Sequence, residues 1–135
     1  MAQETGEIWS NSWILVRLGY VSLRQGHLEQ ARALFDRSQT LFVEEDLKIG
    51  VAFTLEGLAS LSVVGGQPER AAEVFAWADV VRETVGNFRP PIEQAAVDKD
   101  LATIRLQISD TAFADAQARG RAMAMDMAIA RALGR

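Results

Sequence analysis

The stretch Leu18–Ser38, LGYVSLRQGHLEQARALFDRS, returns 40 residues later as Leu58–Ala78, LASLSVVGGQPERAAEVFAWA. Six positions are identical at this offset, one each of Leu, Ser, Gly, Glu, Ala and Phe, and others, such as Gly19 and Ala59, are conservative. A fixed period of this size is typical of a helical repeat array, in which each unit buries its apolar face against a neighbour. The duplication therefore predicts a stacked, all-helical architecture.

Composition narrows the class of protein further. The chain has 135 residues, of which 49% are hydrophobic, and this is enough for one domain with a real core. It has no cysteine, which excludes disulfides and thiolate metal sites. No apolar run approaches the roughly 18 residues of a membrane span. The acidic start, residues 1–7, does not resemble a signal peptide, so we expect a cytoplasmic protein without a membrane partner.

The charge distribution bears on nucleic-acid binding. The formal net charge is −4, and the 14 basic residues are scattered singly, with Arg119 and Arg121 as the closest pair. Duplex DNA binders usually carry a clustered basic face. We therefore expect no direct binding to nucleic acid.

Apolar spacing and breakers divide the chain into about seven helices. Gly26, Gly65–Gly66, Gly86 and Gly120 end helices, and Pro68 and Pro91 suit first helical turns. Ser109 or Asp110 suits the N-terminal cap of the sixth helix. No strand pattern is present. We predict one all-α domain over residues 1–135, with a first repeat at about 8–46, a second at about 47–86 and divergent helices at 91–134. The expected helices cover about Glu7–Gln25, Leu28 into the acidic run 44–46, Leu47–Val64, Pro68–Val85, Pro91–Ile108, Thr111–Arg119 and Met123–Leu133.

Both copies resemble the tetratricopeptide repeat. The order of signature residues is Leu15, Leu18, Gly19, Gly26, Ala31, Phe35 and Ser38 in the first copy, and Leu55, Leu58, Ala59, Gly66, Ala71, Phe75 and Ala78 in the second. Ser22 and Ser62 replace the usual aromatic residue, the closing proline is absent, and the period is 40 instead of 34. The extra residues lengthen either the connection between the repeats or its flanking helices. The resemblance implies a short right-handed solenoid of antiparallel helix pairs.

A narrower resemblance concerns three segments: LEGLA at 55–59, QPERAA at 67–72, and the tail 113–133. They are similar to the C-terminal helical region of MalT- and LuxR-like bacterial ATPase transcriptional regulators, in which helical repeats act as sensor or interaction surfaces. The phosphate-loop motif of that family is absent from this chain, as is its DNA-binding helix-turn-helix. The resemblance therefore implies a sensor or scaffold part, without ATPase or DNA-binding activity.

No constellation indicates catalysis or metal binding. The single histidine, His27, lies in a turn without a nucleophile or an orienting group nearby. The acidic run 44–46 lacks the pattern of a calcium loop and reads as a solvated helix end. Of the three methionines near the end, we expect Met123 and Met127 to pack and Met125 to be partly exposed. We predict no catalytic residue, no cofactor and no metal.

The resemblance does suggest a binding face, because the first helix of each tetratricopeptide unit lines the concave groove. Aromatic residues and arginine are common interface hot spots. An alternative for Trp13 and Tyr20 is that they cover an end of the stack. The residues expected on the groove are Trp13, Val16, Tyr20, Arg24, Phe53, Glu56 and Ser60, with Val64.

The leading hypothesis is a non-enzymatic module that binds a protein or peptide, because a short solenoid offers a large shaped surface. A second hypothesis is a structural spacer or homo-oligomerisation unit, which would bury Ile8, Trp9 and Trp13 against another copy. A third is a small-molecule sensor, for which the sequence shows no pocket.

Overall fold

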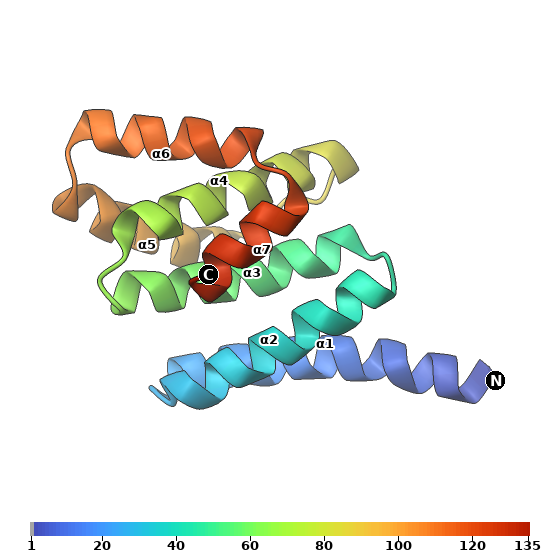
Figure 1. Ribbon diagram of the computed structural model, residues 1–135. Helices are drawn as coiled ribbons and strands as arrows, with labels where there is room; N and C mark the ends of the chain where they lie inside the picture. The colour runs from blue at the N-terminus through green and yellow to red at the C-terminus, as the bar shows by residue number, and fades with distance from the viewer. Residues whose placement is uncertain (1) are drawn as a thin grey trace.

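The computed structural model describes the backbone of residues 2–135 and the side chains of residues 11–135. This described part is all-helical, as predicted, and Figure 1 shows its helices stacked in layers. None of the described helices is long and apolar enough to cross a membrane. The seven helices of the described residues are α1 (Ala2–Arg24), α2 (Leu28–Glu44), α3 (Lys48–Val64), α4 (Pro68–Val85), α5 (Pro91–Gln107), α6 (Asp110–Ala122) and α7 (Met125–Leu133).

The first four helices form two stacked hairpins, α1 with α2 and α3 with α4. The same reverse turn joins α1 to α2, α2 to α3, and α3 to α4. It places Gly26, Asp46 and Gly66 in the left-handed region, at φ of 80°, 56° and 76°. In each turn the next residue's amide bonds back to a carbonyl five residues earlier, as from His27 N to Ser22 O at 2.9 Å.

These turns explain the long period. The connection between the two hairpins is as short as the turns inside them, so the extra residues lengthen the helices and not the loop. The period of 40 is the combined length of α2 and α3, which have 17 residues each, and of the three-residue turn that follows each of them. Of the two explanations left open by the sequence, the lengthened helices are correct.

Phenylalanine rings on α2 fill the space between the hairpins. Phe35 is fully buried between Gly19 of α1 and Gly57 of α3. A Cβ atom on Gly57 would lie 2.3 Å from the Phe35 ring, so only glycine admits the ring in this position. Phe42 lies in the same way against Gly50. The backbones of α1 and α3 can thus approach α2 closely.

The regular pairing ends after α4. Although α5 and α6 follow each other in the chain, α6 packs mainly against α4, and α7 folds back over α3 and α4. Gly120 was expected to end a helix, but it lies inside α6, where a Cβ atom would meet Glu73 O at 2.0 Å. That prediction was wrong because the glycine serves a close helix crossing. Of the two caps that the sequence left open for α6, Ser109 is the correct one, and its hydroxyl accepts from Ala112 N.

Candidate functional site

The predicted groove residues do not form one surface. The aromatic members join α1 to α3: the Trp13 ring lies 4.8 Å from Phe42 and 5.4 Å from Phe53, both in edge-to-face geometry. Tyr20 packs edge-on against Phe35 and donates its hydroxyl to Phe53 O at 2.6 Å. These contacts stabilise the stack, and they leave Trp13, Tyr20 and Phe53 only partly exposed.

Two further members lie inside the molecule. Val16 is 2% exposed and belongs to the core, and Glu56 is 4% exposed. Glu56 accepts from Arg82 Nη2 at 2.6 Å and from Arg89 Nε at 2.7 Å. Arg89 also donates to Asp79 at 2.7 Å. Glu56 is therefore the centre of a buried ion cluster and does not face an open groove.

The cluster is balanced in charge, with two carboxylates and two guanidinium groups. Burial lowers the pKa of Arg89, but Glu56 and Asp79 raise it more, so its pKa lies above its ordinary value. Arg89 belongs to the linker after α4, and Arg82 Nη1 binds Asn87 in the same linker at 2.7 Å. The cluster thus fastens the linker to α3 and α4.

The remaining predicted members are Arg24, Ser60 and Val64. Arg24 and Val64 are exposed. Ser60 donates its hydroxyl to Asp100 of α5 at 2.6 Å, so that this side chain ties α3 to α5. The structure therefore divides the predicted site into packing residues, one ion-cluster residue and two exposed residues at the ends of α1 and α3.

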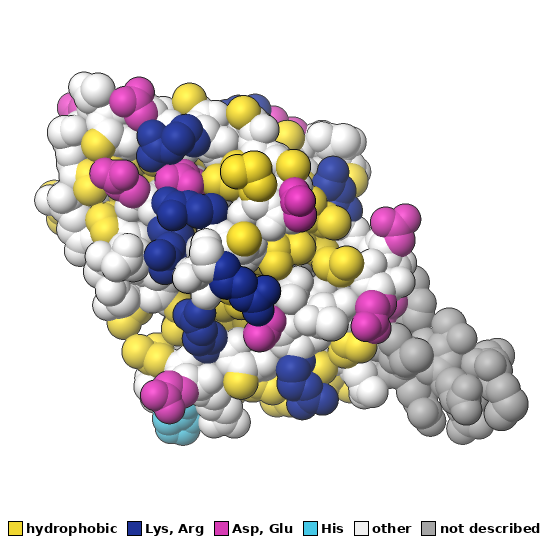
Figure 2. Space-filling view, in the orientation of Figure 1, with side chains coloured by type: hydrophobic (Ala, Val, Ile, Leu, Met, Phe, Trp, Pro, Cys, Tyr) yellow, Lys and Arg dark blue, Asp and Glu magenta, His cyan; other side chains and the backbone are white. Residues whose placement is uncertain are grey.

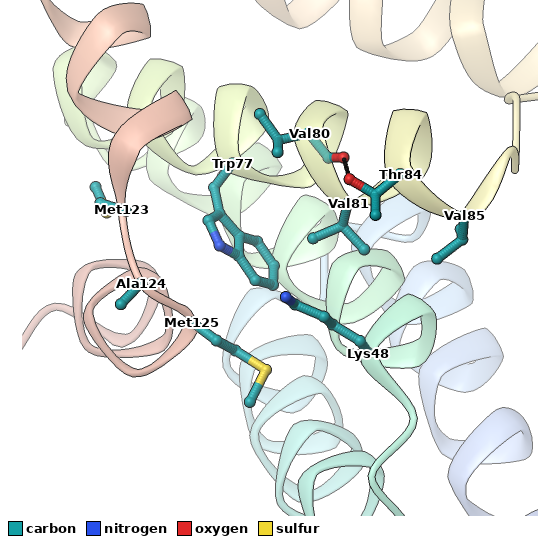
Figure 3. A pocket seen from close by; sticks show the side chains of 9 residues that line it. All are labelled: Lys48, Trp77, Val80, Val81, Thr84, Val85, Met123, Ala124 and Met125. Atoms are coloured by element: carbon teal, nitrogen blue, oxygen red, sulfur yellow. Dashed lines mark hydrogen bonds between the residues drawn. The ribbon is translucent and has the colours of Figure 1, made fainter.

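Two adjoining hollows lie elsewhere, at the start of α7: the first between α7, α3 and α4, and the second between α7, α2 and α3. We call them together the Lys48 groove, because Lys48 and Met125 line both. Figure 3 shows the first of the two. Their cavity volumes are about 140 and 190 Å³. The first is lined by Lys48, Trp77, Val80, Val81, Thr84, Val85, Met123, Ala124 and Met125, and the second by Phe42, Val43, Asp46, Leu47, Lys48, Val51 and Met125.

The groove is apolar and small. Each hollow is below the roughly 300 Å³ of a typical small-molecule site, and is closer to the volume of a single large side chain. Lys48 is the one charged lining residue of the first hollow, and it has no ion pair among the described residues. This arrangement suits two apolar side chains of a partner better than a cofactor.

Sequence reasoning missed this groove and misplaced Met127. Met123 packs against the core and Met125 is partly exposed, as predicted, and both line the groove. Met127 was expected to pack, but it is 59% exposed on α7. The triplet of methionines was the only sequence signal, since flexible thioether side chains are common at adaptable interfaces.

The structure offers little else for chemistry. Among residues with described side chains, no three His, Cys, Asp or Glu groups come together to hold a metal ion, and His27 is exposed in its turn. A scan of protein-family models and searches of curated proteins and solved structures find no match to this chain.

Proposed function

We propose that this chain is a non-enzymatic protein-interaction module that takes a peptide segment of a partner into the Lys48 groove. The observation that carries the proposal is the pair of adjoining apolar hollows, each of side-chain volume, on four different elements of the fold. Adjacent hollows of this kind fit consecutive apolar side chains of an extended or helical segment. The methionine wall can adapt to their shapes.

The repeat order agrees with this function. Tetratricopeptide-like arrays are binding scaffolds, and the similarity to bacterial transcriptional regulators suggests a sensor or scaffold role inside a signalling protein. In both settings a rigid helical stack presents a surface while the chemistry lies on other domains. The two hairpins, in which phenylalanine rings pack directly against glycines, supply such a rigid base for the groove.

The test uses a library of random peptides displayed on phage and selected on the folded chain. Ala124 is exposed at the edge of the first hollow, so Ala124→Trp should fill it without disturbing the core. Ala114→Trp, at an exposed position of α6, is the matched control. We expect the selected peptides to bind the wild type and Ala114→Trp with similar affinity, and to bind Ala124→Trp with an affinity roughly tenfold or more lower. Equal binding to both variants would exclude the groove.

A second candidate, self-association, has one specific observation in its favour. Ile14, Leu18 and Val21 form a stripe along one side of α1 and are 51%, 47% and 43% exposed. Ile8 and Trp9, which were expected to contribute, lie outside the described side chains. Sedimentation equilibrium of wild type and Leu18→Glu tests this candidate: a dimer that dissociates in the variant supports it, and a monomer at high concentration argues against it.

A further inference from the structure

Arginine side chains from four helices gather on the side of the molecule where α7 crosses α4. Figure 2 shows the dark blue groups running over α6, α4, α7 and α2. We call Arg32, Arg70, Arg119 and Arg131 the arginine face. Arg119 and Arg131 share the carboxylate of Glu73, with Arg131 Nε at 2.9 Å and Arg119 Nη2 at 3.2 Å.

The other two guanidinium groups have no carboxylate. Both converge on Gly134, the left-handed cap of α7: a Cβ atom there would lie 3.1 Å from Arg70 Nη1 and 3.7 Å from Arg32 Nη2. Arg32 donates to Leu133 O. Arg70 has no hydrogen bond to any described residue, and its Nε is buried without an acceptor. A buried donor in this state normally has a partner, because leaving it unpaired costs about 1–3 kcal/mol.

Helix capping explains only part of this arrangement. A cation beside the carboxyl end of α7 is favourable, and the bond from Arg32 to Leu133 O uses one of five donors. Arg70 adds no such bond. The guanidinium groups of Arg32 and Arg70 therefore keep most of their N–H donors free beside Gly134. A planar guanidinium group matches the paired oxygen atoms of a carboxylate or phosphate.

The charge balance points in the same direction. Among the described residues, Glu69 and Glu73 are the carboxylates paired with the arginine face, and both bind Arg119 or Arg131, so Arg32 and Arg70 keep their charge without a carboxylate partner. The whole chain is negative, at −4. A local positive face on a negative protein favours a short acidic segment, whereas a long nucleic-acid backbone would meet repulsion beyond the face.

We propose that Arg32 and Arg70 form an oxyanion site that binds carboxylate side chains of an acidic segment in a protein partner. The inference rests on the proposed interaction function but uses a different surface from the Lys48 groove. Each carboxylate accepts paired N–H donors from the terminal nitrogens of one guanidinium group. Arg119 and Arg131 stay bound to Glu73 and contribute long-range attraction.

The probe is a fluorescently labelled hexaglutamate peptide with blocked ends, followed by anisotropy at low ionic strength. We expect binding that weakens roughly tenfold in Arg70→Gln and in Arg32→Gln, since hydrogen bonds to charged groups are the strong ones. Arg70→Lys keeps the charge but loses the fork, and should lose most of the affinity. Arg17→Gln, at an exposed arginine of α1, is the matched control and should bind as wild type does.

Three results would overturn the proposal. These are no binding by the wild type, equal losses in Arg17→Gln and Arg70→Gln, and binding of a twelve-nucleotide oligothymidylate as strongly as the peptide. Full displacement by millimolar inorganic phosphate would reduce the site to a small-anion site and would also count against it. Thermal unfolding of each variant checks that it folds. Ala124→Trp should bind hexaglutamate normally, so failure of the groove and failure of this site are separable.

Discussion

The two repeats fill equivalent positions between their paired helices with different kinds of side chain. In the first, Trp13 of α1 lies edge-on to Phe42 of α2, with ring centroids 4.8 Å apart. Forty residues later the same two positions are Phe53 and Arg82, and the Arg82 guanidinium lies 4.3 Å from the centre of the Phe53 ring. An aromatic pair has become a cation over an aromatic ring, at the same place in the hairpin.

That exchange changes what the surroundings must supply. A buried phenylalanine needs only shape, whereas buried Arg82 needs an anion. Glu56 supplies it, at the position that Val16 occupies in the first repeat. The ion cluster also binds Arg89 of the linker, at the point where regular stacking ends. The comparison teaches that the repeat preserves helix geometry while the second copy uses buried charge to attach the irregular part of the chain.

Removing the anion should have the largest effect. Glu56→Gln leaves Arg82 and Arg89 buried with only Asp79 as a charged partner. We expect the free energy of unfolding to fall by about 3–5 kcal/mol, because a broken buried ion pair leaves uncompensated charge. Urea denaturation measures the loss. Glu83→Gln, which removes an exposed carboxylate bound to Arg121, is the control and should change stability little; similar losses in both would show that the cluster is not special.

Restoring the chemistry of the first repeat should recover part of that loss. In Glu56→Val with Arg82→Phe, both positions take the residues of the first repeat, and Arg89 keeps Asp79 as a balanced partner. We expect this double variant to be more stable than Glu56→Val alone by about 2 kcal/mol, as judged by urea denaturation. If the effects of the two substitutions on the free energy of unfolding simply add, the repeats are not interchangeable at these positions.

The glycines that contact the Phe35 ring should give the next largest effect on stability. Gly19 and Gly57 flank Phe35, but the corresponding seats around Phe75 are Ala59 and Val97. Gly57→Ala would push a methyl group into the Phe35 ring, and we expect a loss of about 1–3 kcal/mol in urea denaturation. Gly65→Ala is the control and should cost less, because a Cβ atom there would lie 3.3 Å from Leu61 O, against 2.3 Å from the Phe35 ring at Gly57. A neutral Gly57→Ala would mean that the hairpins can move apart at no cost.

The sequence predicted the architecture better than the site, for a physical reason. The repeat and its glycines specify helix ends, which depend on local backbone preference, so α4 was predicted well, with Pro68 in its first turn and Gly86 as its cap. Glu56 was placed on a groove because the repeat position puts it there. Its burial depends on Arg82 and Arg89, which are distant in the sequence. Gly120 was misread for a similar reason, since its contact is with Glu73 of another helix.

The Lys48 groove could not be predicted from periodicity at all. It forms where α7 folds back over the second repeat, and nothing in the spacing of residues 110–133 specifies that return. The arginine face likewise joins residues from four helices. Local patterns fix single elements, whereas surfaces built from late, irregular elements depend on how these elements pack.

Tyr20 allows a spectroscopic test of whether the two repeats are equivalent, with a smaller expected effect. Tyr20 and Ser60 are equivalent, and each donates forward to the next first helix, to Phe53 O and to Asp100. Burial, followed by the charge of Glu56, raises the pKa of Tyr20 well above its ordinary value. Its neutral form is therefore favoured in the fold, and this contribution is lost as the pH rises above about 10.

We expect the ultraviolet absorbance of tyrosinate, which reports only Tyr20 in this chain, to appear together with alkaline unfolding. In Tyr20→Phe the alkaline unfolding transition should shift to higher pH. If tyrosinate formed while circular dichroism stayed native, the hydroxyl would be accessible, and the link between α1 and α3 would be weaker than its geometry indicates.

Asp100, which accepts the hydrogen bond from Ser60, should give the smallest effect on stability. Burial raises the pKa of Asp100, and the hydrogen bond from Ser60 opposes this only in part. The fold therefore favours the protonated carboxyl, whose contribution is complete below the unfolded pKa of about 3.9 and lost as the pH rises through the folded pKa. Asp100→Asn keeps an acceptor for Ser60 without the charge, so it should raise stability at pH 7 by at most about 0.5 kcal/mol. Thermal unfolding near pH 3, where Asp100 is neutral, should show no gain. A loss at pH 7 would mean that the charged hydrogen bond outweighs burial, and that the second link is the stronger of the two.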